Sequence, residues 1–299
     1  MVRCKINEHS LTYPSSWDEL SLSQLIYIIR LYFSGIPETE LRIKALIQIV
    51  RLKFTRRRPV YEGGTYNHLL RLNKKTSVWL SDVQLTAMSD KLQFLTQRFK
   101  NEFDLDSYTL DSHLTINLFD RFRHRLVMYY GPSDKLFNIS FGEFITAETN
   151  FNRYVKDKQG EDLDKLIATL YRPKAKNIDP LLYEGDMREA FNDHLVDGRA
   201  AKLKKLDHVI KVGILLYYQG CRKFIMKRFP AVFKKSKKNT TSAVPGFLAL
   251  VDALAMDDVT KTQKVYKEKL YTVMVRLQKA AEKYDEMQAE LEKKKQKTR

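Results

Sequence analysis

A heptad repeat near the C-terminal end is the feature that most restricts how this chain can fold. Apolar residues recur at intervals of 4, 3, 4, 3, 4, 3 and 4 residues, at Tyr266, Leu270, Val273, Leu277, Ala280, Tyr284, Met287 and Leu291. A mean spacing of 3.5 residues is the seam of a coiled coil, in which one face of a helix packs against another helix. We therefore predict a long C-terminal helix that ends in the basic tail Lys293–Arg299. The eight seam residues are a candidate helix interface.

The sequence leaves the partner of this seam open. Ala280 is small, whereas Tyr266 and Tyr284 are bulky and have polar tips, so the seam favours docking on a helix of different shape over a symmetric parallel dimer. In one alternative the chain's own body covers the seam near Leu270–Leu277 and the helix projects freely beyond Ala280. In the other, a second subunit covers its whole length. A purely intramolecular helix is an equally good interpretation, since terminal helices often dock on their own domain.

Other amphipathic segments indicate a mainly α-helical fold. Capping-box spacing at Ser16 and Glu19, and again at Ser21 and Gln24, offers two alternative starts for a first helix. Helical spacing predicts helices over residues 22–33, 43–54, 81–99, 142–155, 162–171 and 247–254, with further helix from about residue 202. Eleven glycines and eight prolines provide few tight turns, which favours helices over a many-stranded sheet. The predicted class is mainly α: an irregular multi-helix protein with a long heptad-patterned C-terminal helix and room for a minor β-hairpin in 59–80 or 101–120.

Length and composition fit a globular protein. Of the 299 residues, 43% are apolar and 30% are charged, which excludes a disordered or low-complexity chain. No stretch approaches the roughly 20 apolar residues of a membrane span, and the opening residues lack the apolar core of a signal peptide. Two cysteines, Cys4 and Cys221, are too few for a zinc site of thiolates alone and fit a reducing compartment. We expect a helical unit over 1–125, a second over 126–260, and the long helix with its tail over 261–299.

Positive charge gathers in one segment of a chain whose formal net charge is +17. Lys202–Lys238 holds twelve Lys or Arg residues and one acidic residue, Asp207. The centre, Val212–Tyr218, is apolar all round, yet Lys211 and Arg222 are only about 16 Å apart on a helix, so a core helix is predicted rather than a membrane span. The candidate polyanion-binding residues are Lys227, Arg228, Lys234, Lys235, Lys237 and Lys238. For the first two, charge complementarity to a helix C-terminus is the alternative explanation.

The sequence contains no recognisable catalytic or metal-binding motif. GxxxxGK[ST], GxGxxG, GxSxG and HExxH are absent, and no two of the six histidines stand four residues apart. Asn192-Asp193-His194 with Asp197 places a carboxylate beside a histidine but offers no nucleophile, so ordinary helix or loop residues are the favoured interpretation. Glu184-Gly185-Asp186 could bind a cation but is better explained as a loop. We therefore predict no enzyme activity, no metal site and no cofactor.

Two short basic stretches have the composition of nucleic-acid surfaces. Arg121-Phe122-Arg123-His124-Arg125 interleaves basic and aromatic residues, and Arg56-Arg57-Arg58 could contact phosphates. A solvated helix face explains the first better, and a basic loop explains the second equally well. A pI near 9.6 meets the first criterion for a polyanion binder. No helix-turn-helix, zinc-finger, RNA-recognition or OB signature accompanies it.

Three stretches of the chain carry a resemblance to known proteins. They are Trp17-Asp18-Glu19-Leu20-Ser21-Leu22-Ser23-Gln24-Leu25; Tyr130-Gly131-Pro132-Ser133-Asp134-Lys135-Leu136-Phe137-Asn138-Ile139-Ser140-Phe141 with Glu143-Phe144; and Leu166-Ile167-Ala168-Thr169-Leu170-Tyr171-Arg172-Pro173 followed by Leu215-Leu216-Tyr217-Tyr218-Gln219-Gly220-Cys221-Arg222. Together they resemble uncharacterised proteins in the tail and structural gene modules of phages and prophages of Bacteroides-like bacteria. The resemblance spans much of the chain and implies a role in virion assembly. It supplies no catalytic residues.

The function predicted from the sequence is therefore non-enzymatic. We expect a phage or prophage virion protein, or a tail-assembly factor, that acts through protein–protein contacts in the bacterial host cytoplasm during assembly or in the virion. Its expected partners are other phage structural or assembly proteins and the chain itself. The alternative is a nucleic-acid-binding protein that uses the basic segment 202–238, and an enzyme built around Asp193 and His194 is the least favoured.

Overall fold

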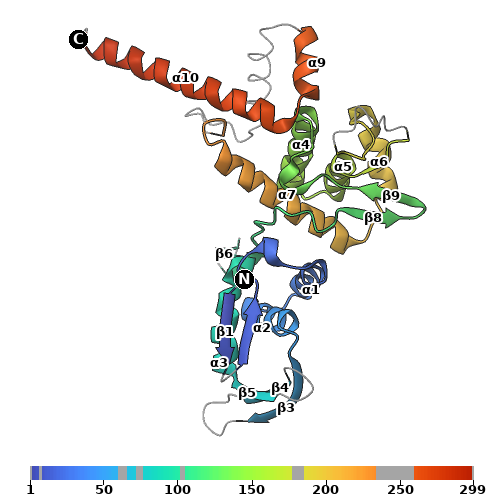
Figure 1. Cartoon of the computed structure of the whole chain (residues 1–299), viewed down its shortest axis with the longest axis vertical. Helices are drawn as coiled ribbons and strands as arrows, with labels where there is room; N and C mark the ends of the chain where they lie inside the picture. Colours follow the sequence, from blue (N-terminus) through green and yellow to red (C-terminus); the bar gives the residue numbers. More distant parts are fainter. Residues whose placement is uncertain are drawn as a thin grey trace. The chain divides into compact units, whose positions relative to one another are not determined.

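The computed structural model describes residues 2–6, 9–59, 66–71, 77–101, 105–176, 185–233 and 259–297. These residues belong to two compact units. Unit 1 comprises Met1–Leu118 with His208–Gly220, and unit 2 comprises Phe119–Asp207 with Cys221–Arg299. Figure 1 shows the helices and strands of each unit in chain order.

Helices and strands are mixed in this chain, so the predicted mainly α fold is wrong. The fold is about 58% helical with 18% strand. Within the described residues the strands form small antiparallel sheets with the orders β1-β2, β3-β4-β5, β6-β7 and β10-β9-β8. The sequence predicted at most one minor hairpin, in 59–80 or 101–120. In the structure both regions contribute strands, and two further sheets lie outside them.

The scarcity of glycine and proline misled the prediction for two physical reasons. The connections from β3 to β4 and from β4 to β5 span residues 60–65 and 72–76, which are longer than the two-residue turns that demand glycine. The tight turn of β8–β9 is made instead by Arg125, whose φ of +54° lies in the left-handed region. A non-glycine residue in this conformation is uncommon, so counting glycines underestimates the number of hairpins.

Unit 1 begins with a hairpin and a pair of helices. Its first elements are β1 (Val2–Ile6), β2 (His9–Tyr13), η1 (Trp17–Glu19), α1 (Leu22–Phe33) and α2 (Glu38–Ile49). The capping box that starts α1 is the one at Ser21 and Gln24, with both reciprocal hydrogen bonds present. Leu25 of α1 and Leu46 of α2 are fully buried. The predicted helical pair is therefore confirmed, although α2 stops at Ile49 and does not reach Phe54 as expected.

The rest of unit 1 alternates strands with short helices. Its elements are β3 (Lys53–Pro59), β4 (Tyr66–Arg71), β5 (Ser77–Ser81), α3 (Asp82–Ser89), η2 (Asp90–Leu95), β6 (Thr96–Lys100) and β7 (Asp106–Leu110). Buried Leu70, Val78 and Leu80 form a small core with Leu52 and Leu85. A capping box formed by Ser81 and Gln84 starts α3, where the sequence predicted a helix to begin. The helix expected over 81–99 is wrong beyond residue 95, where the chain turns into β6.

Unit 2 is built on two packed helices and a three-stranded sheet. Its elements up to residue 207 are β8 (Arg121–His124), β9 (Val127–Tyr130), η3 (Asp134–Leu136), α4 (Phe141–Asp157), α5 (Gly160–Leu170), β10 (Arg172–Pro173), η4 (Asp193–Leu195) and α6 (Val196–Leu203). Helices α4 and α5 match the helices predicted over 142–155 and 162–171. Phe122 and Tyr129 are stacked across β8 and β9 and are buried on the inner face of the sheet. The other face carries Arg121 and Arg123.

Helix α7 (His208–Arg228) contains the apolar segment that the sequence singled out. Ile214, Tyr217 and Tyr218 are buried, which confirms the prediction of a core helix. Gly220 lies against the backbone of Leu114, where an added Cβ would come within 2.4 Å of both its carbonyl oxygen and its amide nitrogen. The position therefore requires glycine.

The C-terminal part of unit 2 consists of α9 (Val259–Lys267) and the long helix α10 (Leu270–Lys297). The predicted long helix is confirmed from Leu270 onwards, but the helix is interrupted at residues 268–269, so Tyr266 belongs to α9 and not to the long helix as expected. The helix expected over 247–254 lies outside the described residues, as do the lysines at 234, 235, 237 and 238.

Candidate interaction surfaces

The polar cluster closest to a catalytic arrangement is open to solvent. Asp193 and His194 lie in the short helix η4, and the side chain of His194 is 89% exposed, with Nε2 3.7 Å from Asp193 Oδ1. Asp197 lies 3.3 Å from Lys165 Nζ instead of joining them. Groups that are this exposed are screened by water, so this cluster provides no enclosed site for chemistry.

The acidic stretch that could have bound a cation forms an ion pair instead. Glu184 lies outside the described residues, but the carboxylate of Asp186 accepts hydrogen bonds from Nε and Nη2 of Arg188 at 2.9 and 2.7 Å. The guanidinium of Arg188 therefore occupies the place that a cation would take. Within the described ranges, no three His, Cys, Asp or Glu side chains converge in a way that could hold a metal ion.

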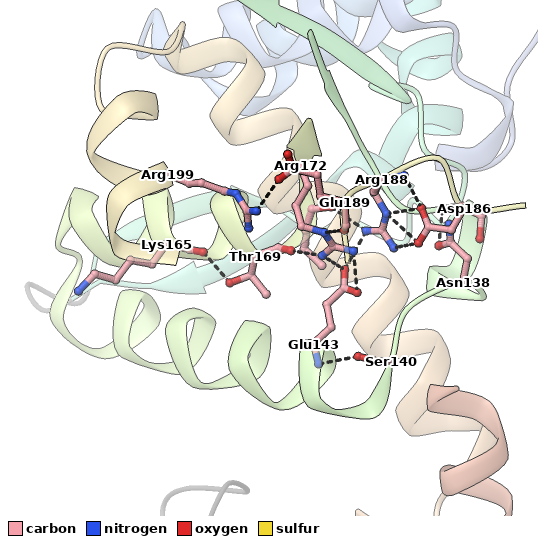
Figure 2. A network of polar contacts seen from close by, with 12 residues as sticks. Asn138, Ser140, Glu143, Lys165, Thr169, Arg172, Asp186, Arg188, Glu189 and Arg199 are labelled. Carbon is pink, nitrogen blue, oxygen red and sulfur yellow. Dashed lines mark hydrogen bonds and ion pairs between the residues drawn. The ribbon is translucent and has the colours of Figure 1, made fainter. Parts of the chain in front are cut away.

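A buried network of charges lies at the centre of unit 2 (Figure 2). Glu143, near the start of α4, is 1% exposed and accepts hydrogen bonds from Arg172 and Arg188, which are themselves buried. The Nη1 atom of each arginine lies 2.8 Å from Glu143 Oε1, and Arg172 Nη2 donates to Glu143 Oε2 at 3.2 Å. Arg199 of α6 extends the network by donating to the carboxylate of Glu189 at 2.7 Å. Three arginines thus face the three carboxylates of Glu143, Asp186 and Glu189, and the charges balance.

Burial and ion pairing act against each other in this network. Burial lowers the pKa of Arg172 from its usual value, with the nearby Glu143 opposing that change. For Arg188, burial also disfavours the charged form, but Glu143 and Asp186 outweigh it and raise the pKa. Burial would raise the pKa of Asp186, and the hydrogen bonds from Arg188 more than compensate, so this pKa lies below its usual value. Arg188 and Asp186 thus each favour the charged form of the other.

The network fastens a distant segment onto α4 and α5. Arg172 donates to the carbonyl oxygens of Thr169 and Glu189 at 2.7 and 2.8 Å. The amide of Glu189 donates back to the carbonyl of Pro173 at 2.9 Å. These bonds join the residues that follow α5 to those that precede η4. We interpret the network as structural, because its charged groups form ion pairs with one another and hydrogen bonds with the backbone.

The inner part of α10, Leu270–Lys279, is anchored on the body of unit 2. Leu270, Val273 and Leu277 are buried. The amide of Leu270 donates to the carbonyl of Ile139 at 3.0 Å, and Gln278 Oε1 accepts from the amide of Ala231 at the same distance. Tyr266, the remaining inner seam residue, lies in α9 and its side chain is half-buried. It packs closely on Gly142, where an added Cβ would lie 3.0 Å from Tyr266 Cδ1. This part of the seam therefore has its partner within the chain.

The outer part of α10, residues 280–297, continues the same seam, and no described element covers it over Ala280–Met287. Ala280 is exposed, Tyr284 is 62% exposed and Met287 is 54% exposed. Leu291 belongs to the helix, but its side chain is not among those described. Figure 1 shows α10 continuing away from α4 and α9. The seam residues thus divide at Leu277 into a covered set and an exposed set, which is the first of the two alternatives drawn from the sequence.

The candidate polyanion-binding residues are only partly within the described chain. Lys227 and Arg228 are exposed at the end of α7, and the four lysines at 234, 235, 237 and 238 lie outside it. Arg222 is not available for phosphate binding, since its Nε donates to the buried carboxylate of Glu148 at 2.7 Å. The basic segment therefore contributes in part to the packing of α7 on α4.

The arginine-rich stretch at 121–125 forms a hairpin and not the solvated helix face that the sequence favoured. Its tip, residues 123–128, exposes Leu126, Val127 and Met128, with Leu126 89% exposed. Arg121, Arg123 and Arg125 are exposed around these apolar side chains. The alternation of arginine with Phe122 and His124 was a visible signal for a strand with one inner and one outer face.

The comparisons with known proteins give no family assignment. No family model, no curated protein and no solved structure matches the chain. In the parts of the chain that the structure describes, no helix combines the length and apolarity needed to cross a bilayer.

Proposed function

We propose that this chain is a non-enzymatic phage or prophage protein that acts in particle assembly, as a virion protein or tail-assembly factor, through protein–protein contacts. The observation that carries the proposal is the exposed outer seam of α10. Tyr284 and Met287 are large apolar side chains at helical spacing on a face with no partner element in the described chain. An amphipathic helix presented in this way is suited to docking in a groove of a partner protein. The contact would form in the bacterial host cytoplasm during assembly.

The three stretches that carry the resemblance to phage tail and structural modules lie mostly in the core. Most apolar residues of these three stretches are buried. They include Trp17, Leu25, Leu136, Ile139, Phe141, Phe144, Leu166, Ile167, Leu170, Tyr171, Leu216, Tyr217, Tyr218 and Cys221. The three stretches therefore contribute mainly to packing of the core, and they do not indicate where a partner would bind. Partner choice has to come from exposed features such as the outer part of α10.

Truncation of α10 tests the proposal in the bacterial host that produces the particles. A chain that lacks residues 280–299 keeps Gln278 and its bond to Ala231, so it should fold. We expect this chain to be lost from purified particles and from complexes with tail proteins, as measured by mass spectrometry. A chain that lacks only the basic tail 293–299 is the matched control and should be retained. Normal incorporation of the shorter chain would refute the proposal.

Nucleic-acid binding through the segment 202–238 is the second candidate function. It is favoured by the exposed Lys227 and Arg228 at the end of α7. Replacing both with glutamate should weaken DNA binding and reduce its salt dependence if this function is correct. The leading proposal predicts that this double variant is still retained in particles, whatever its affinity for DNA.

A further inference from the structure

The tip of hairpin β8–β9 is basic, residues 282–292 of α10 are acidic, and both carry exposed apolar side chains. We propose that the tip of hairpin β8–β9 in one copy of this chain binds the outer part of α10 in a second copy. This inference rests on the proposed function, because it names the partner of the outer part of α10. It also assigns a role to the hairpin, which the proposed function leaves unused.

The hairpin supplies the basic side of the contact. Leu126 stands at the turn, and Val127 and Met128 are 39% and 38% exposed beside it. Arg121, Arg123 and Arg125 surround these side chains, and none of the three forms an ion pair within the described part of the chain. Arginine combines a charged group with a large contact area and is enriched at the energetic centres of protein interfaces.

Residues 282–292, within the outer part of α10, supply the acidic side; the lysines 293, 294, 295 and 297 that follow them bring residues 280–297 as a whole to no net charge. Residues 282–292 contain five Asp or Glu residues and one lysine, in a chain whose net charge is +17. Glu286 and Glu290 are four residues apart, so they share one side of the helix next to Met287. Neither forms an ion pair within the described residues, and both are exposed. An apolar stripe with carboxylates beside it complements the apolar, arginine-rich tip of the hairpin.

The position of the seam favours a narrow partner over a second α10. The body of unit 2 covers the same face of the helix up to Leu277. A second helix laid along Ala280–Leu291, in either direction, would meet the covered stretch within a few turns, since three turns span only about 16 Å. A hairpin has two strands about 5 Å apart and can reach the exposed stretch without passing over the covered one.

The arrangement of the two surfaces makes the contact intermolecular. In unit 2, hairpin β8–β9 and the outer part of α10 extend to opposite sides (Figure 1). One chain therefore cannot join its own two surfaces. Because the contact uses two different surfaces, it is heterologous, and repeated contacts add copies in a ring or a filament. The contact is small, so each junction is weak and depends on salt.

Two double variants test this pairing. The hairpin variant combines Arg123→Glu with Leu126→Asp, and the helix variant combines Tyr284→Asp with Met287→Asp. All four positions are exposed, so both proteins should fold, which thermal melting by circular dichroism checks. Sedimentation velocity at low salt should show concentration-dependent oligomers for the wild type. These should diminish in 0.5 M salt, where charges are screened over a distance of about 4 Å. Each variant alone should associate at least ~10-fold more weakly.

Mixing the variants gives the decisive result. The hairpin variant keeps an intact α10 and the helix variant keeps an intact hairpin, so an equimolar mixture should form dimers and nothing larger. A wild-type chain that stays monomeric, a hairpin variant that associates as the wild type does, or a mixture that stays monomeric would each overturn the pairing. If the pairing fails but loss of residues 280–299 still excludes the chain from particles, the proposed function holds and only the partner is wrong.

Discussion

At the scale of single residues, the feature with the largest expected effect on stability is the burial of Glu143 between two arginines. The nearly complete burial of this carboxylate and of Arg172 and Arg188 means that each charge depends on the others for its stability. Breaking a buried ion pair on one side leaves an uncompensated charge, which costs more than the pair itself contributes.

Glu143→Gln should therefore destabilise unit 2 by about 3–5 kcal/mol. Chemical denaturation that monitors the free energy of unfolding is the measurement. Glu161→Gln in α5 is the control, because Glu161 pairs with Lys165 at an exposed site, where the effect of such a pair is small. Equal losses for the two variants would mean that the network does not stabilise the fold.

Asp186 gives the network a pH dependence whose sign follows from its lowered pKa. Its ordinary value is 3.8, and the folded value is lower because Arg188 outweighs the effect of burial. The carboxylate therefore stabilises the fold fully above about pH 4, and this contribution is lost as the pH falls towards the folded pKa. The stability difference between the wild type and Asp186→Asn should be largest at pH 7 and shrink at pH 3. A constant difference would contradict this assignment.

Two glycines in helices should respond to alanine in opposite ways. At Gly220 an added methyl group would overlap the backbone of Leu114, so Gly220→Ala should cost about 3 kcal/mol. At Gly198 in α6 nothing lies within 4 Å of the added atom, so Gly198→Ala should stabilise by about 0.5–1 kcal/mol. Thermal melting of both variants distinguishes close packing at Gly220 from a general effect of helical glycine.

At the scale of elements, local signals in the sequence predicted where helices begin better than where they end. Ser21 and Ser81 each cap a helix with a glutamine three residues later, and both helices begin where the sequence predicted a helix start. The helix ends at Ile49 and Leu95 were missed, because the apolar residues beyond them, such as Phe54 and Phe99, continue the helical spacing but belong to strands. Periodicity does not distinguish a helix face from a short strand when only one or two residues remain.

The buried network was not visible in the sequence for a different reason. Glu143 is 29 residues from Arg172 and 45 from Arg188. Only the packing of α4 against α5, with the return of the chain near Glu189, brings these residues together. The exposed seam could be predicted because its period is local, whereas its division at Leu277 depends on how much of α10 the rest of unit 2 covers.

The outer part of α10 should contribute little to the stability of the isolated chain. Tyr284 and Met287 are more than half exposed, so removing residues 280–299 takes little apolar area out of the folded core. The melting temperature of the truncated chain should lie within about 2 °C of the wild type. A large drop would show that this part of the helix packs on the chain itself and is not free to bind a partner.

At the scale of the whole molecule, one helix carries both a covered and an exposed part of the seam, and we propose that a partner covers the exposed part. A single exposed helix with no tertiary packing is only marginally stable in water. Residues 280–297 should therefore open and close rapidly in the free chain and become ordered when a partner covers Tyr284 and Met287.

Hydrogen–deuterium exchange of α10 tests this account most directly. The backbone amides of residues 280–297 are compared in the dilute free chain and in the proposed complex with particle or tail proteins, with Val273–Leu277 as the internal reference. We predict fast exchange of the outer part in the free chain, strong protection in the assembly, and slow exchange of the buried reference in both. Equally fast exchange of residues 280–297 in both states, with new protection elsewhere in the chain, would contradict the claim that this helix is the docking surface.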